Sequence, residues 1–251
     1  MKIAAFSGTM IEHSIHQAME MTSKLGLDGI EIACREPHLS AETSRQRVEE
    51  IRELAERHNL QIPAVAGYMG WFSTASDREC EQAFAEFLRI LEWTDLLGAE
   101  MIRIFQGGPH AFLAEDYHYA KAAYWLGRCA EVAKQHDKRL LLEIHNNSLI
   151  ETVESAQRLL RLVDDQVIGL IHDAGNMYIS DADYGREAVL QLQAHIFHVH
   201  VKDELRISEA GAPGTFVNRT KHGEEAFRQC KLGEGEVDYR PVFAALQDIG
   251  Y

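Results

Sequence analysis

Short apolar runs alternate along the chain with longer segments in which apolar residues recur every three or four positions. The apolar runs predict β-strands that begin near Ile3, Gly29, Ile62, Met101, Leu140, Val167 and Ile196. The segments between them predict amphipathic helices, most clearly at Thr43–His58, Asp77–Leu97 and Glu115–His136. Because strands that alternate with helices form parallel sheets, the pattern indicates an α/β fold of seven strand–helix units.

Two regions depart from this repeat. The segment from Glu204 to Val237 is rich in glycine and charged residues, and we expect it to be a long irregular loop that acts as a lid. A final helix is predicted up to Tyr251, where an eighth strand would begin. We therefore expect an α/β (β/α)8 TIM barrel that forms one domain over residues 1–251, with the eighth strand absent after Tyr251.

Composition narrows the class of protein. With 251 residues and 46% hydrophobic content, the chain can bury a large core. Neither a secretory signal nor an apolar stretch long enough to span a membrane is present in the sequence, so we expect a cytoplasmic protein without a membrane partner. The four cysteines are scattered, and we expect them to be reduced packing residues: Cys34, Cys80, Cys129 and Cys230.

The net charge limits the substrates. A formal charge of −14 disfavours a nucleic acid, because most of the surface repels phosphate groups. A small neutral molecule is easier to accommodate. Composition leaves open whether the chain forms a homo-oligomer.

Three residues of the kinds that bind metals stand at the carboxyl ends of consecutive predicted strands. Glu143, Asp173 and His200 end the runs "LLLE", "VIGLIHD" and "IFHVH", with spacings of 30 and 27 residues. A parallel barrel uses roughly 30 residues per strand–helix unit and places its active site at these strand ends. Two carboxylates and one imidazole suit a divalent cation, with Mn²⁺ expected first and Mg²⁺, Co²⁺ or Zn²⁺ as alternatives.

Each of these residues also has an ordinary structural explanation. Glu143 taken alone is better explained by an ion pair with Arg103, since buried charges are normally paired. Three ligand types at one-unit spacing reverse that preference. His198 lies two residues deeper than His200, and we expect a core histidine or one that orients a ligand. His172 has the opposite strand parity to Asp173 and should face the helices.

The motifs "LLLEIHNN", "LIHDAGNM", "HVHVKD" and "LGEGEVDYRPVFAALQDIGY" together resemble the sugar phosphate isomerase/epimerase family, which has a xylose-isomerase-like TIM barrel. Its relatives include hydroxypyruvate isomerase, ketose 3-epimerases, inosose dehydratase and 3-dehydroshikimate dehydratase. The resemblance implies metal ligands at Glu143, Asp173 and His200. It also implies a fourth ligand, a Glu on strand eight, which has no counterpart here. Asn176 stands where some relatives carry a His, and it is expected to contact the substrate or to support a ligand.

Four further residues are candidates for substrate contacts. His145 shares the strand face of Glu143, and Lys202 that of His200, so both are expected to polarise substrate hydroxyls; a Schiff base at Lys202 is the less favoured alternative. Glu31 at the end of the second strand is explained equally well by an ion pair with Arg103. Trp71 would form an apolar wall, although aromatics at a barrel mouth are as often plain packing.

The glycines Gly233 and Gly235 in "LGEGE" are expected to form a structural turn. A phosphate cradle is disfavoured there, because Glu234 and Glu236 would repel the phosphate.

These features predict a divalent-metal-dependent isomerase or epimerase of a small keto-sugar. Glu143, or its strand-eight partner, would remove the proton next to the carbonyl, and the cation would stabilise the enediolate. The alternative is a dehydratase acting on an inosose or a 3-dehydroshikimate-like ring, which begins with the same step. A non-catalytic sugar-binding protein is a less favoured hypothesis. An abasic-site endonuclease is also weaker, because Asn176 and the acidic charge count against it.

Overall fold

The computed structural model describes residues 1–208 and 211–251. The chain divides into two compact units, and each is described here by itself. Unit 1 comprises residues 1–70, 75–105 and 128–141, and unit 2 comprises residues 71–74, 106–127 and 142–251. The prediction of one domain over the whole chain stays a prediction.

The seven predicted strands are all present and parallel. They are β1 (Ala4–Phe6), β2 (Gly29–Ala33), β3 (Ala64–Ala66), β4 (Met101–Arg103), β5 (Arg139–Glu143), β6 (Ile168–Asp173) and β7 (Ile196–His200). Their hydrogen-bonded order is the order of the chain, with β1 and β7 at its two ends. Asp173 of β6 is in register with His200 of β7, so the ends of these two strands are level.

Helices follow the strands as the sequence pattern predicts. They are α1 (Ile15–Lys24), α2 (Arg45–Arg57), α3 (Asp77–Leu97), α4 (Asp116–Gln135), α5 (Val153–Val163), α6 (Ala174–Ile179), α7 (Arg186–Leu192) and α8 (Tyr239–Asp248), with short 3-10 helices at Ser7–Met10 and Ala111–Leu113. None of the described helices combines the length and the hydropathy that crossing a membrane requires.

Local signals explain why α3 begins and ends where the sequence predicts. The Ser76 hydroxyl accepts from the Glu79 backbone N–H, and the Glu79 carboxylate accepts from the Ser76 backbone N–H, which forms a capping box. The helix ends at Gly98, whose φ of +71° is the left-handed conformation that glycine adopts at little cost.

Each unit has its own apolar core. In unit 1 the buried apolar side chains include Ile30 and Ile32 on β2, Val65 on β3, and Phe87 and Leu91 on α3. In unit 2 the fully buried side chains include Leu142 on β5, Leu170 and Ile171 on β6, Leu159 on α5 and Leu246 on α8. Close packing of the unit 2 core fixes the positions of the strand ends that carry the candidate ligands.

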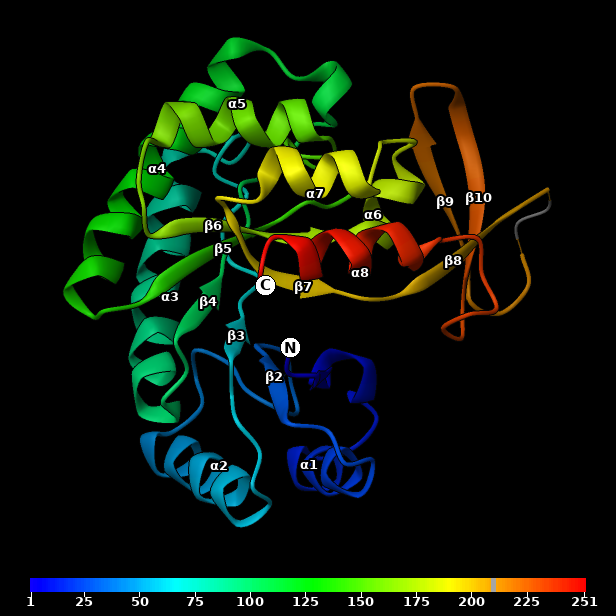
Figure 1. Cartoon of the computed structure of the whole chain (residues 1–251). Helices are drawn as coiled ribbons and strands as arrows, with labels where there is room; N and C mark the ends of the chain where they lie inside the picture. Colours follow the sequence, from blue (N-terminus) through cyan, green and yellow to red (C-terminus); the bar gives the residue numbers. More distant parts are fainter. Residues whose placement is uncertain (209–210) are drawn as a thin grey trace. The chain divides into compact units, whose positions relative to one another are not determined.

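The expectation of an irregular lid between Glu204 and Val237 is wrong for most of that segment. It folds into an antiparallel sheet of β8 (Asp203–Ile207), β9 (Thr215–Thr220) and β10 (Gly223–Cys230), in the order β8-β10-β9. Figure 1 shows this sheet in orange shades beyond the end of β7. Residues 209 and 210, which fall within the predicted lid, lie outside the described residues.

Candidate metal site

The three predicted ligands are the last residues of their strands. Glu143 ends β5, Asp173 ends β6 and His200 ends β7, all in unit 2. One ligand atom from each lies within 4.8 Å of the others. The Nδ1 atom of His200 is 3.2 Å from Glu143 Oε1 and 3.8 Å from Asp173 Oδ2. The structure therefore brings together the three side chains that the spacing of the motifs selected.

This donor set fits a divalent cation. Ligand atoms at about 2.0 to 2.4 Å from one ion lie no more than about 4.8 Å apart. The three atoms of this site meet that limit, because all of them lie within 4.8 Å of one another. Both carboxylates are buried. Burial raises the pKa of Asp173, and the neighbouring Glu143 raises it further, while Lys202 and His200 act in the opposite direction. Two buried carboxylates this close together favour a bound positive charge.

Asn176 links the ligands to Lys202. Its side-chain Nδ2 donates to Glu143 Oε1 at 3.1 Å and to the Ile144 carbonyl at 3.2 Å. Its Oδ1 accepts from Lys202 Nζ at 2.5 Å. Lys202 Nζ also lies 3.3 Å from Asp173 Oδ2. The asparagine therefore uses both ends of its amide, and it holds the lysine and the glutamate in a fixed relation.

The start of α6 makes room for this arrangement. Asp173 caps the helix by accepting a hydrogen bond from the Asn176 backbone N–H at 2.8 Å. At Gly175, a Cβ atom would lie only 2.6 Å from Lys202 Cγ. A glycine at this position therefore lets the lysine side chain run along the helix toward Asp173.

Tyr239, which the sequence analysis did not select, fixes the backbone of Lys202. Its hydroxyl accepts from the Lys202 N–H at 3.0 Å and donates to the Lys202 carbonyl at 2.6 Å. Burial raises the pKa of this phenol well above its ordinary value. The residue lies within the motif "LGEGEVDYRPVF", and that was the signal that could have found it.

The expected structural turn at Gly233 and Gly235 is confirmed, with Asp203 at its centre. The Asp203 carboxylate accepts backbone hydrogen bonds from Gly233 at 2.8 Å, from Gly235 at 3.0 Å and from Val237 at 3.2 Å. A carboxylate already occupies the donors of this turn, so a phosphate has no place there.

Of the two strand histidines next to the ligands, His172 behaves as the strand parity predicts, while His198 is half-buried rather than part of the core. His172 is fully buried and lies 3.0 Å from the Tyr184 carbonyl through Nε2, in the connection between α6 and α7. Burial lowers the pKa of His172 to about 4. The ring of His198 packs edge-on against the ring of His200, with centroids 5.4 Å apart.

The remaining candidates take varied positions. His145 follows β5 and is half-buried, and its Nδ1 donates to the Asn146 carbonyl at 2.6 Å. Trp71 in unit 2 is 47% exposed with a φ of +60°. In unit 1, Glu31 is buried on β2, and the guanidinium of Arg103 stacks on Tyr68. Substrate contacts by His145, Trp71 and Glu31 stay predictions.

The chain belongs to the xylose isomerase-like TIM barrel family, whose sequence model matches residues 19–251. An inosose dehydratase from Clostridium perfringens is 23% identical over 255 residues, which cover 96% of this chain and 80% of that protein. One from Glaesserella parasuis is 27% identical over 212 residues, covering 78% of this chain and 70% of that protein. The predicted fold and family are therefore confirmed.

Solved structures show the same fold. The probable 3-DHS dehydratase AsbF from Bacillus anthracis aligns with a TM-score of 0.81 and 21% identity, over 100% of this chain and 90% of that one. The IOLI protein, solved with a zinc atom, aligns with a TM-score of 0.80 and 18% identity, over 100% and 86%. A D-psicose 3-epimerase aligns with a TM-score of 0.76 and 19% identity, over 100% and 82%.

Proposed function

We propose that this xylose isomerase-like TIM barrel protein is a divalent-metal-dependent lyase that removes water from a polyhydroxylated ring ketone. The observation that carries the proposal is the cluster of Glu143, Asp173 and His200 at three neighbouring strand ends, with the Lys202 ammonium beside it. The sequence alone placed a sugar isomerase or epimerase first and a dehydratase second. The names of the curated relatives, inosose dehydratases, favour the second reading.

The residues of the site match the first chemical step of such a reaction. Water loss next to a ketone begins with removal of a proton from the carbon beside the carbonyl. Glu143 is the candidate base, because it is buried and is oriented by Asn176 and His200. A divalent ion bound by Glu143, Asp173 and His200 would polarise the ketone and an adjacent hydroxyl. Mn²⁺ remains the ion expected first, with Mg²⁺, Co²⁺ and Zn²⁺ as alternatives.

Lys202 is the candidate for stabilising negative charge on the substrate oxygen. Its Nζ is held by Asn176 and Asp173, so its direction is fixed before the substrate arrives. Tyr239 adds to this rigidity by holding the lysine backbone. A fixed ammonium is more useful than a mobile one, because no reorganisation is needed as the charge develops.

Product analysis tests the proposal. Purified protein with Mn²⁺ is incubated in D₂O with a panel of inososes, 3-dehydroshikimate and free ketoses. A dehydratase gives a new absorbance with a ring ketone: that of a conjugated carbonyl product from an inosose, and that of an aromatic product from 3-dehydroshikimate, which is already an enone. Deuterium incorporation into ketoses without that absorbance would support the isomerase or epimerase instead. Glu143→Gln should abolish both signals, while Glu224→Gln, at an exposed position on β10, should retain wild-type rates.

A further inference from the structure

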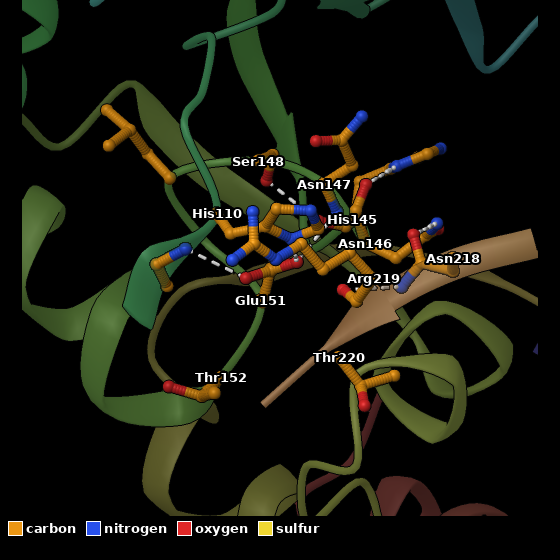
Figure 2. A network of polar contacts seen from close by, with 12 residues as sticks. His110, His145, Asn146, Asn147, Ser148, Glu151, Thr152, Asn218, Arg219 and Thr220 are labelled. Carbon is orange, nitrogen blue, oxygen red and sulfur yellow. Dashed lines mark hydrogen bonds and ion pairs between the residues drawn. The ribbon is translucent and has the colours of Figure 1, made fainter. Parts of the chain in front are cut away.

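A second pair of acid–base side chains lies outside the metal cluster, in unit 2. His110 precedes the 3-10 helix at Ala111–Leu113, and Glu151 lies between β5 and α5. Both side chains are buried, with His110 8% exposed. The His110 Nδ1 atom lies 2.7 Å from Glu151 Oε1. Figure 2 shows this pair within a network of polar side chains.

Glu151 fixes the direction of the His110 ring. The carboxylate also accepts from the backbone N–H groups of Ala111 at 2.8 Å and Asn147 at 2.7 Å, so it cannot turn away. Because a carboxylate only accepts, His110 Nδ1 donates to Glu151, and Nε2 is the atom that can gain or lose a proton. The ring of Phe112 stacks on the imidazole, with centroids 5.0 Å apart.

The Nε2 atom of His110 is accessible and has no hydrogen-bond partner among the described residues. It is absent from the set of fully buried polar atoms without a partner, so it is not enclosed by the protein. His38 shows the contrasting arrangement. Its Nδ1 lies 3.1 Å from Ser7 Oγ and its Nε2 lies 2.9 Å from the His13 carbonyl. His38 therefore uses both ring nitrogens within the fold, whereas His110 uses only Nδ1.

The pair is tied to the loop that leaves Glu143. That loop carries His145, Asn147 and Ser148 before it reaches Glu151, and the Ser148 hydroxyl donates to the His145 carbonyl at 2.8 Å. The Leu149 N–H donates to the Gly107 carbonyl at 2.8 Å, which joins it to the loop that carries His110. Figure 2 shows His110, His145 and Glu151 in one network. The pair is therefore held at the same end of the strands as the metal cluster.

We propose that His110, oriented by Glu151, is the acid that protonates the departing hydroxyl group. This inference rests on the proposed dehydration. Glu143 takes the proton from the carbon beside the ketone, and a C=C bond forms as the C–O bond at the next carbon breaks. The oxygen leaves with the bonding pair and takes the Nε2 proton of His110 in its imidazolium form, so that water is released and a neutral ring remains with its proton on Nδ1. Glu143 then loses its proton and His110 regains one by exchange with solvent, and no oxidant or reductant is required.

The test separates proton removal from loss of the leaving group. His110→Gln should lower the rate of water release by about 10²- to 10³-fold, the usual contribution of a general acid. It should retain exchange of the α-hydrogen with D₂O, because that step belongs to Glu143. A substrate analogue with fluorine in place of the departing hydroxyl should restore elimination in the variant to near the wild-type rate, because fluoride leaves without a proton.

Two further variants complete the design. Glu151→Gln should show the same pattern more weakly, because it only positions the imidazole. His222→Gln is the matched control, since the His222 side chain also pairs with a carboxylate, at 2.9 Å from Asp181, and makes no described contact with His110 or Glu151. It should behave as wild type. Calorimetric titration with Mn²⁺ checks that His110→Gln keeps the metal site, which a misfolded variant would lose.

Three outcomes would overturn the inference. An unchanged rate of water release in His110→Gln would remove His110 from the reaction and leave the proposed dehydratase standing. Equal losses of exchange and of fluoride elimination in a variant that still binds Mn²⁺ would give His110 a structural role. A wild-type protein that exchanges the α-hydrogen but releases neither water nor fluoride would overturn both the inference and the proposed function.

Discussion

Replacing Glu204 with glutamine should stabilise the protein, and the gain should be larger at alkaline pH than at acid pH. Glu204 lies on β8, is 2% exposed, and its Oε2 atom makes no hydrogen bond to any described residue. Burial raises its pKa from 4.5 to about 7; the positive charge of Lys202 opposes this shift, and the carboxylates of Asp173 and Asp203 add to it. The folded protein therefore holds this carboxyl in its protonated form more tightly than the unfolded chain does.

The sign and size of the effect follow from proton linkage. Because the pKa is higher in the folded state, ionisation of Glu204 destabilises the fold as pH rises from 4.5 to about 7. The difference corresponds to about 1 kcal/mol at pH 5 and about 3 kcal/mol at pH 8. Glutamine has a similar shape and no charge, so Glu204→Gln should exceed the wild type by these amounts. The gain should grow by about 2 kcal/mol between the two pH values.

Urea unfolding followed by tryptophan fluorescence measures this difference. The experiment is run at pH 5 and pH 8 with a chelator present, so that metal binding does not contribute. Glu224→Gln is the control, because Glu224 is exposed on β10, and it should change stability by less than about 0.5 kcal/mol at either pH. This prediction is refuted if the stability difference between Glu204→Gln and wild type is the same at both pH values, or if the variant is the less stable protein at pH 8. Glu204 would then ionise as readily in the folded protein as in the unfolded chain.

Three other outcomes are expected. Glu143→Gln should weaken Mn²⁺ binding by at least about tenfold in calorimetric titration, and an unchanged affinity would exclude Glu143 as a ligand. Gly175→Ala should destabilise the fold by about 1–3 kcal/mol in thermal unfolding, because the new Cβ lies 2.6 Å from Lys202 Cγ; wild-type stability would mean that the lysine moves aside without loss. Cys129 is buried and burial raises the pKa of its thiol, so a disulfide reagent at pH 8 should modify it only after unfolding, and rapid labelling in the native protein would contradict this.

The sequence predicts those parts of the fold that depend on short-range pattern. The ends of α3 follow from the Ser76 capping box and from Gly98, all within a few residues of the helix. Glu143, Asp173 and His200 could be grouped because parallel strands of similar length bring their carboxyl ends to the same edge. Lys202 follows from strand parity with His200. None of these inferences required knowledge of which side chains meet across long separations.

The antiparallel sheet could not be predicted, because its burial runs against hydrophobicity. On β9, the polar residues Asn218 and Thr220 are buried, while Val217, which precedes Asn218, is 53% exposed. Asn218 is buried because its Oδ1 accepts from Asn146 Nδ2 at 3.1 Å, across 72 residues of sequence. A period of two in hydrophobicity is the usual signal of a strand, and here a tertiary contact between two amides replaces it.

The same kind of long-range contact explains why β8 matters to the site. Lys202 immediately precedes β8, and Arg206 lies within it on the same side of the chain. Lys202 pairs with Asp173 at the start of α6, and Arg206 pairs with Asp181 just after its end, at 2.9 Å. These two ion pairs therefore hold β8 beside α6. The candidate ligand Asp173 caps the first turn of that helix. Glu204 stands between the two cations but makes no ion pair with either in the described structure. Glu204 is therefore a buried carboxyl that the folded state favours in its protonated form. Comparing the unfolding free energies of Glu204→Gln and wild type at pH 5 and pH 8 measures how strongly.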